Sequence, residues 1–189
     1  AIGSSAAPGV LICAGLDPSG SAGFLADAQV VAKLGGRPAG VVTALTVQNT
    51  TGVISARALD PAYVREQLEF LLNDLELRAV KIGMVGSSAI ARALGAALGL
   101  MKVPVVWDPL LYPSRSDVAL ADSLFGEAFE ALAPRVTLLT PNVQELAFLT
   151  GRRIGRLDAA IDAAAMLAAR LGAAVLVKAG EFGGDASVD

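Results

Sequence analysis

Polar side chains suited to a metal or phosphate site occur at three places in the second half of the chain. Asn142 and Glu145, three residues apart, can cap a helix N-terminus, and they can equally orient Mg²⁺, because a hard cation prefers oxygen ligands. Asp108 could serve the same metal or a phosphate. Lys178 ends an apolar run, where its ammonium group either binds a polyphosphate or only extends to solvent.

Three residues in the first half could contact a heteroaromatic ring. Asp27 falls on the expected apolar stripe of a helix, where a carboxylate needs a partner or ligand, although the helix dipole also favours an early acid. Gln48 offers a donor beside an acceptor, which complements an aminopyrimidine edge or satisfies loop backbone groups. Met84, after Gly83, can form a polarisable wall or ordinary core packing.

The glycine-rich segment 15–23 joins an expected strand to an expected helix. Its glycines allow the backbone to approach a ligand at the helix N-terminus, or they simply form a tight turn. The segment is neither Gly-x-Gly-x-x-Gly nor a P-loop, and the second strand does not end in an acid. A dinucleotide-binding oxidoreductase is therefore disfavoured.

The composition excludes several chemistries. The 189 residues contain no histidine, which rules out a histidine-based triad and a histidine-ligated metal site. The single Cys13 rules out an internal disulfide or a cysteine-rich metal site and fits the reducing cytoplasm. A net charge of -3, from 15 basic and 18 acidic side chains, gives no reason to expect nucleic acid or a membrane as partner. The length predicts a single domain over residues 1–189.

Short apolar runs alternate with longer segments of helical periodicity, as is typical of parallel strands covered by helices on both faces. The expected strands are residues 10–14, 41–47, 79–82, 103–107, 136–140 and 174–177. The expected helices are residues 21–35, 61–75, 88–100, 119–132, 142–149 and 158–171, with a surface loop at 111–118. Ser21 is expected to cap the first helix and Leu34 to lie on its apolar stripe. The predicted fold class is an α/β three-layer sandwich with a mainly parallel sheet.

The polar residues described above follow the ends of the expected strands. Ligands of open α/β sheets bind beyond the carboxyl ends of the strands. The sequence therefore predicts one site at this edge, although the edge alone does not identify a substrate.

Six short motifs follow one another along almost the whole chain. They are residues 14–23 followed by Ala26-Asp27, residues 43–53, residues 80–84, Asp108-Pro109, residues 140–145 and residues 177–180. Each is weak alone, but the six in this order resemble the hydroxymethylpyrimidine/phosphomethylpyrimidine kinases of thiamine biosynthesis. The resemblance implies the ribokinase-like form of the α/β sandwich.

Carried over residue by residue, the resemblance implies a pyrimidine pocket beside a site for Mg²⁺ and phosphates. The residues expected at the pyrimidine are Gly15, Asp27, Gln48, Met84 and Leu110. Those expected at the nucleotide and phosphates are Asp108, Asn142 and Lys178, with Asp108 and Glu145 as metal ligands.

The sequence departs from the family pattern in two places. Lys178-Ala179-Gly180-Glu181 stands where the family has Lys-Gly-Gly-His, and the family's later Gly-Thr-Gly-Cys motif is not among the 189 residues. In related kinases that glycine-rich turn supplies the base and the amides that stabilise the transferring phosphoryl group. We therefore expect the natural protein to continue past Asp189 and to carry its catalytic base there.

The expected activity is ATP- and Mg²⁺-dependent phosphorylation of 4-amino-5-hydroxymethyl-2-methylpyrimidine, followed by phosphorylation of its monophosphate. Two alternatives remain: a pyridoxal or pyridoxine kinase of the same superfamily, and a catalytically inactive pyrimidine-binding regulator. Gln48 and Met84 favour the aminopyrimidine. A cytoplasmic homodimer without nucleic-acid or membrane partners is expected.

Overall fold

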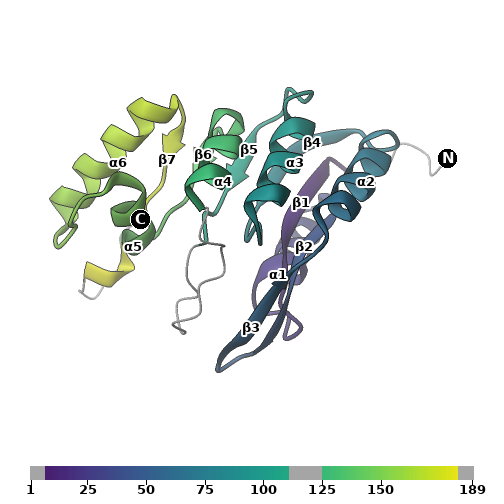
Figure 1. Cartoon of the computed structure of the whole chain (residues 1–189), viewed down its shortest axis with the longest axis horizontal. Coiled ribbons are helices and arrows are strands. Elements are labelled where there is room, and N and C mark those ends of the chain that lie inside the picture. Colours follow the sequence, from purple (N-terminus) through teal and green to yellow (C-terminus); the bar gives the residue numbers. More distant parts are fainter. Residues whose placement is uncertain (1–6, 111–124, 183–189) are drawn as a thin grey trace.

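The computed structural model describes residues 7–110 and 125–182, in which strands and helices alternate (Figure 1). The strands are β1 (Gly9–Leu16), β2 (Arg37–Asn49), β3 (Gly52–Ala58), β4 (Leu77–Ile82), β5 (Val105–Trp107), β6 (Leu138–Leu139) and β7 (Ala174–Val175). The helices are α1 (Gly23–Lys33), α2 (Pro61–Leu72), α3 (Ser88–Leu98), α4 (Phe125–Leu132), α5 (Val143–Thr150) and α6 (Leu157–Leu171), with 3₁₀ turns η1 (Ala133–Arg135) and η2 (Gly180–Phe182). The predicted loop at 111–118 and the first residues of the helix predicted at 119–132 lie outside the described residues. Of the helices in the described ranges, none is both long and apolar enough to cross a bilayer.

The seven strands form one sheet in the order β3-β2-β1-β4-β5-β6-β7, and only the β2–β3 pair is antiparallel. The connection from β1 to β2 and the later connections from β4 onward run in opposite directions along the sheet. Right-handed crossovers therefore place α1 on one face and the later crossover helices on the other, where Figure 1 shows α2, α3 and α4 in a row. This architecture confirms the predicted α/β sandwich with a mainly parallel sheet.

The core lies on both faces of the central strands. Leu11, Ile12 and Cys13 of β1 are all fully buried, although consecutive strand residues point to opposite faces. Burial raises the pKa of the Cys13 thiol to about 12, so this thiol stays protonated and unreactive. Trp107 of β5 stacks on Phe129 of α4 with ring centroids 5.6 Å apart, which joins the sheet to that helix.

The start and the apolar stripe of the first helix differ from the prediction. α1 begins at Gly23, and the Ser21 hydroxyl donates to Asp17 at 2.9 Å instead of capping the helix. Leu34 is 82% exposed because the helix ends just before it. Both sequence-based expectations are wrong, since the loop before the helix is organised around Asp17.

Strand β3 is the one described strand that the sequence reading missed. Most of its side chains are exposed, so its sequence contains no continuous apolar run. It pairs with the end of β2 through a turn in which Asn49 Oδ1 accepts from the backbone N–H of Thr51 at 2.9 Å and of Gly52 at 3.2 Å. In this two-stranded ribbon, Gln48 lies near the carboxyl end of β2 and pairs with Val53 of β3.

Candidate functional site

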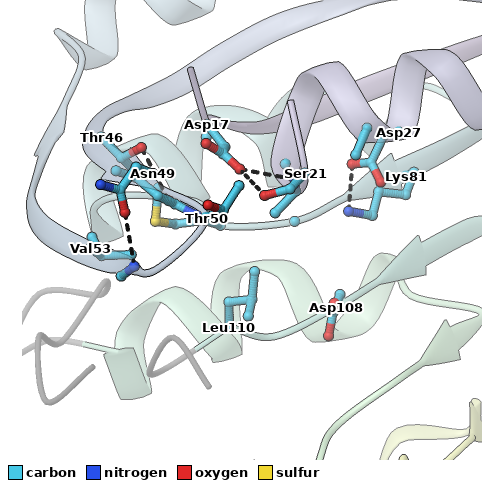
Figure 2. A pocket seen from close by; sticks show the side chains of 18 of the residues that line it. Asp17, Ser21, Asp27, Thr46, Asn49, Thr50, Val53, Lys81, Asp108 and Leu110 are labelled. Carbon is cyan, nitrogen blue, oxygen red and sulfur yellow. Dashed lines mark hydrogen bonds and ion pairs between the residues drawn. The ribbon is translucent and has the colours of Figure 1, made fainter. Parts of the chain in front are cut away.

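A cleft of about 770 Å³ opens where β1, β2, β4 and β5 end (Figure 2). Because β1 pairs with two strands whose crossovers run in opposite directions, this cleft lies at the topological switch point of the sheet. The structure brings seven of the nine predicted site residues together in its lining: Gly15, Asp27, Gln48, Met84, Asp108, Leu110 and Lys178. Asn142 and Glu145 do not belong to the lining.

The loop after β1 is held by the carboxylate of Asp17, which is 3% exposed. This carboxylate accepts from the Ser19 hydroxyl and the Ser19 backbone N–H, both at 2.8 Å, from the Ser21 hydroxyl at 2.9 Å and from the Ala22 backbone N–H at 3.0 Å. Burial opposes ionisation of Asp17, but these hydrogen bonds outweigh it and lower its pKa below the usual value. Asp17 lines the cleft, although the sequence reading used it only as part of a motif. The sequence feature that could have indicated this role is the pair of serines, Ser19 and Ser21, that follow Asp17 and donate to it.

Two glycines of this loop lie where a Cβ would come very close to neighbouring atoms. Gly23 has a φ of +60°, and a Cβ there would lie 2.3 Å from the carbonyl oxygen of Gly15. A Cβ on Gly15 would lie 2.2 Å from the terminal methyl carbon of Met84. The glycines therefore let the loop, the start of α1 and the methionine wall pack directly against one another.

One side of the cleft is apolar. Met84 and Ala44 are buried, and Val53 and Leu110 pack against them. The backbone of Met84 is fixed because its carbonyl accepts from the Thr43 hydroxyl. Residues from three other segments therefore pack around Met84 and hold it at the cleft.

Gln48 lies beside this apolar wall at the end of β2. Its side chain is half-buried, and Oε1 lies 3.2 Å from the Thr46 hydroxyl, which also lies 2.9 Å from the carbonyl oxygen of Leu16. A single hydroxyl hydrogen can serve only one of these acceptors at a time. The Gln48 amide group lines the cleft next to the apolar side formed by Met84, Val53 and Leu110.

Asp27 has the partner that its position on α1 required. The Lys81 ammonium lies 2.6 Å from Asp27 Oδ2, and both side chains line the cleft (Figure 2). The sequence reading missed Lys81 as a site residue. Its signal was a lysine inside the apolar strand Val80-Lys81-Ile82, but its partner lies 54 positions earlier and cannot be found by local spacing.

A second ion pair lies across the cleft from the loop. The Lys178 ammonium is 2.6 Å from Asp108 Oδ1, and the two side chains are 38% and 24% exposed. The Lys178 backbone N–H donates to the Pro141 carbonyl at 2.9 Å, which fixes the end of the chain segment that carries the lysine. Both residues were predicted at the phosphates, and the structure places their charged groups in direct contact.

Asn142 and Glu145 form a capping box at the start of α5. The Asn142 backbone N–H donates to Glu145 Oε2 at 2.8 Å, and the Glu145 backbone N–H donates to Asn142 Oδ1 at 2.7 Å. Glu145 is 1% exposed. The capping role is therefore realised, whereas the metal role of Glu145 and the phosphate role of Asn142 stay predictions.

Comparison with known proteins identifies the family. The family profile described as phosphomethylpyrimidine kinase matches residues 17–189. The chain belongs to this family. It is 36% identical over 180 residues to the hydroxymethylpyrimidine/phosphomethylpyrimidine kinase of Rhizobium meliloti, covering 95% of this chain and 68% of that protein. It is 39% identical over 181 residues to the thiamine biosynthesis multifunctional protein ThiED of Corynebacterium efficiens, covering 95% of this chain and 24% of that protein.

Solved structures of kinases share the fold. Phosphomethylpyrimidine kinase from Clostridium difficile 630 superposes with a TM-score of 0.80 at 32% identity, covering 95% of this chain and 78% of that one. Pyridoxal kinase from Staphylococcus aureus in complex with ADP superposes with a TM-score of 0.83 at 27% identity, covering 97% of this chain and 67% of that one. The predicted ribokinase-like fold is confirmed by these neighbours.

The buried Asp17 carboxylate predicts a pH-dependent stability. Its lowered folded-state pKa means that it stabilises the fold above about pH 4, and that this contribution is lost as the pH falls through the lower folded-state value. Asp17→Asn should therefore lower the free energy of unfolding by about 1–3 kcal/mol at about pH 7, because an amide cannot accept all of the loop's hydrogen bonds. The difference from the unsubstituted protein should shrink in acid, as followed by urea unfolding.

The control is Asp74→Asn, which changes an exposed aspartate after α2. It should alter stability by less than about 0.5 kcal/mol at either pH. A pH-independent loss in Asp17→Asn would contradict the assigned role of the charge.

Proposed function

We propose that this chain carries the substrate cleft of an ATP-dependent kinase that phosphorylates the hydroxymethyl group of 4-amino-5-hydroxymethyl-2-methylpyrimidine and then its monophosphate, for thiamine biosynthesis. The observation that carries the proposal is the pairing of two unlike halves within one cleft. One half presents an apolar wall with Gln48 and Asp27, and the other presents the Asp108–Lys178 ion pair. The family membership and the names of the relatives support the same reaction.

In this proposal the ring lies in the first half of the cleft. The Gln48 carboxamide and the Asp27 carboxylate orient the polar edge of the pyrimidine, while Met84 and Leu110 cover its face. Gly15 contributes by leaving room for Met84. Orientation of the hydroxymethyl group toward the nucleotide is a large part of catalysis, because phosphoryl transfer depends mainly on positioning and charge neutralisation.

The phosphates lie in the second half of the cleft. Lys178 supplies a cation to the nucleotide phosphates, with Asn142 beside it, since Asn142 and Lys178 form an isolated parallel bridge. Asp108 offers a hard oxygen ligand suited to Mg²⁺. In residues 7–110 and 125–182, no group of three acidic, cysteine or histidine side chains could hold a metal by itself. This fits Mg²⁺, which commonly binds one or two carboxylates together with substrate phosphates and would neutralise charge on them.

Pyridoxal is the second candidate substrate, because pyridoxal kinases are among the structural neighbours. The deciding experiment measures ATP-dependent phosphoryl transfer by the full-length protein to the aminopyrimidine and, separately, to pyridoxal. Our proposal expects kcat/KM to be higher for the aminopyrimidine. A higher value for pyridoxal would instead identify a pyridoxal kinase, and binding without turnover would identify a regulator.

Gln48 should contribute to affinity for the pyrimidine. Gln48→Leu removes up to two hydrogen bonds of about 0.5–1.5 kcal/mol each, so Kd should rise by roughly 2- to 150-fold. Isothermal titration calorimetry measures this change directly. The control is Gln29→Leu, the same substitution at an exposed position on α1 outside the cleft lining, which should leave Kd unchanged.

Glu145 can be tested for a metal role separately from its capping role. Glu145→Gln keeps a side-chain oxygen that can accept from the Asn142 backbone N–H, so the capping box should survive, whereas the negative charge is lost. We expect Mg²⁺-dependent turnover to fall more than stability, which should change by at most about 1 kcal/mol. Intact activity per folded molecule would leave Glu145 with capping alone.

We also propose that the kinase is cytoplasmic and homodimeric. The β2–β3 ribbon exposes Leu45, Val47 and Ile54 at 46%, 56% and 77%, which is the kind of apolar surface that a second copy could cover.

A further inference from the structure

Lys81 occupies an unusual position for a lysine. Its neighbours in β4, Val80 and Ile82, are 1% and 0% exposed and belong to the main core. Because strand residues alternate between faces, Lys81 points the other way, where its side chain is 26% exposed and lines the cleft. A charged group placed this deep in a strand requires a compensating contact.

The space around the ammonium is shaped by small residues. A Cβ on Gly83 would lie 3.0 Å from Lys81 Nζ and 3.1 Å from the Cβ of Ala14. The backbone of Gly83 is itself tied to β1, because its N–H donates to the Cys13 carbonyl at 2.9 Å. The ammonium group therefore lies in a space that a side chain at position 83 would crowd.

The ammonium group contacts one oxygen of the Asp27 carboxylate. It contacts Oδ2 at 2.6 Å from a different element, β4, while Asp27 comes from α1 (Figure 2). A fixed partner on one carboxylate oxygen restricts rotation of the whole group, so the other oxygen, Oδ1, can accept a hydrogen in a defined direction. An ionised carboxylate is an acceptor only, which favours a ligand group that donates.

We propose that Lys81 is a positioning residue that acts through Asp27 and selects ring substrates that carry an amino group at this place over those that carry an oxygen acceptor. The inference rests on the proposed function, because it concerns how the same cleft chooses its ring. An amino group donates to Asp27 Oδ1, whereas a carbonyl or phenolate oxygen would face the carboxylate without a hydrogen between them. A site that leaves its buried polar groups unpaired rejects such an analogue.

A purely structural role is the competing explanation. Every residue of α1, all within the described part of the chain, is half-buried or exposed, and the helix packs on β1 and β2. The Lys81–Asp27 ion pair could therefore simply fasten this helix to the sheet. The two roles differ in what they predict for ligand selectivity and for coupling between the two residues.

The test is a double-mutant cycle in the full-length protein, with Lys81→Met, Asp27→Asn and the double variant. Calorimetry gives Kd for the aminopyrimidine and for the same pyrimidine with an oxo group replacing the amino group. Loss of one charge-assisted hydrogen bond corresponds to about a 10- to 100-fold rise in Kd, so Lys81→Met should weaken the amino ligand by roughly this factor. It should change Kd for the oxo ligand by less than about 3-fold, and adding Lys81→Met to Asp27→Asn should have little further effect.

Three further measurements make the result specific. KM for ATP should stay unchanged in Lys81→Met, while KM for the aminopyrimidine rises. Lys33→Met, at an exposed lysine in the last turn of α1, should change neither value. Lys81→Arg keeps a cation and should retain part of the selectivity, and together with the double variant it carries the test if Lys81→Met does not fold.

The outcomes separate this inference from the proposed function. Equal weakening of both ligands by Lys81→Met would assign Lys81 to fastening α1, and an undiminished effect in the Asp27→Asn background would assign it a direct ligand contact. Either result overturns the inference while leaving the kinase proposal in place. If the unsubstituted protein does not bind the aminopyrimidine, the proposed function fails and this inference fails with it.

Discussion

The pairing of β1 with β4 is the constraint on which the cleft depends. These strands are not consecutive in the chain, yet Cys13 pairs with Ile82 and the ladder continues to the Gly83 N–H. Because the chain leaves this pair in opposite directions, the connections diverge and a crevice opens between them. A one-residue slip in this register would turn Lys81 into the core and Val80 toward the cleft. Such a slip would bury a charge and expose an apolar side chain, so the alternation of buried and partly exposed residues along β4 favours the observed register.

Several glycines around this crevice lie very close to neighbouring atoms. A Cβ on Gly40 would lie 1.9 Å from the Ile12 carbonyl oxygen, which lets β2 pack tightly beside β1. A Cβ on Gly23 would likewise meet a backbone carbonyl, whereas a Cβ on Gly15 or Gly83 would crowd the flexible end of the Met84 or the Lys81 side chain. Close backbone contacts therefore require glycine at positions 23 and 40, and of these two only Gly23 also has a left-handed backbone. This explains how a glycine-rich loop without a P-loop pattern can still be sharply constrained.

Features that depend on local sequence patterns could be predicted, whereas features that depend on contacts between residues distant in the sequence could not. The parallel strands and the carboxyl-edge site were predictable, because burial on both faces leaves apolar runs that are interrupted only where the strands end. Strand β3 was not, since its stability comes from pairing with β2 rather than from burial. The prediction that Ser21 caps the first helix was wrong, because the Ser21 hydroxyl donates to the nearby Asp17 carboxylate instead. The sequence indicated that Asp27 needs a partner or ligand. It could not identify Lys81 as that partner, because 54 positions separate the two residues.

The two lysine–aspartate pairs of the cleft differ in how far their lysines are exposed. In each, the ammonium and a carboxylate oxygen are 2.6 Å apart, so each lysine is paired with a carboxylate. Lys178 is more exposed than Lys81, at 38% against 26%, and an ion pair contributes less as solvent screens it more. Under the proposed function, exchange of Asp108 for a phosphate oxygen would therefore cost Lys178 little, because phosphate is also an anionic acceptor. Lys81, which lies between the core strands and α1 with Gly83 beside it, has less freedom to exchange its partner. Under the proposed function, the same pair of residue types would give a fixed contact at the ring and an exchangeable contact at the phosphates.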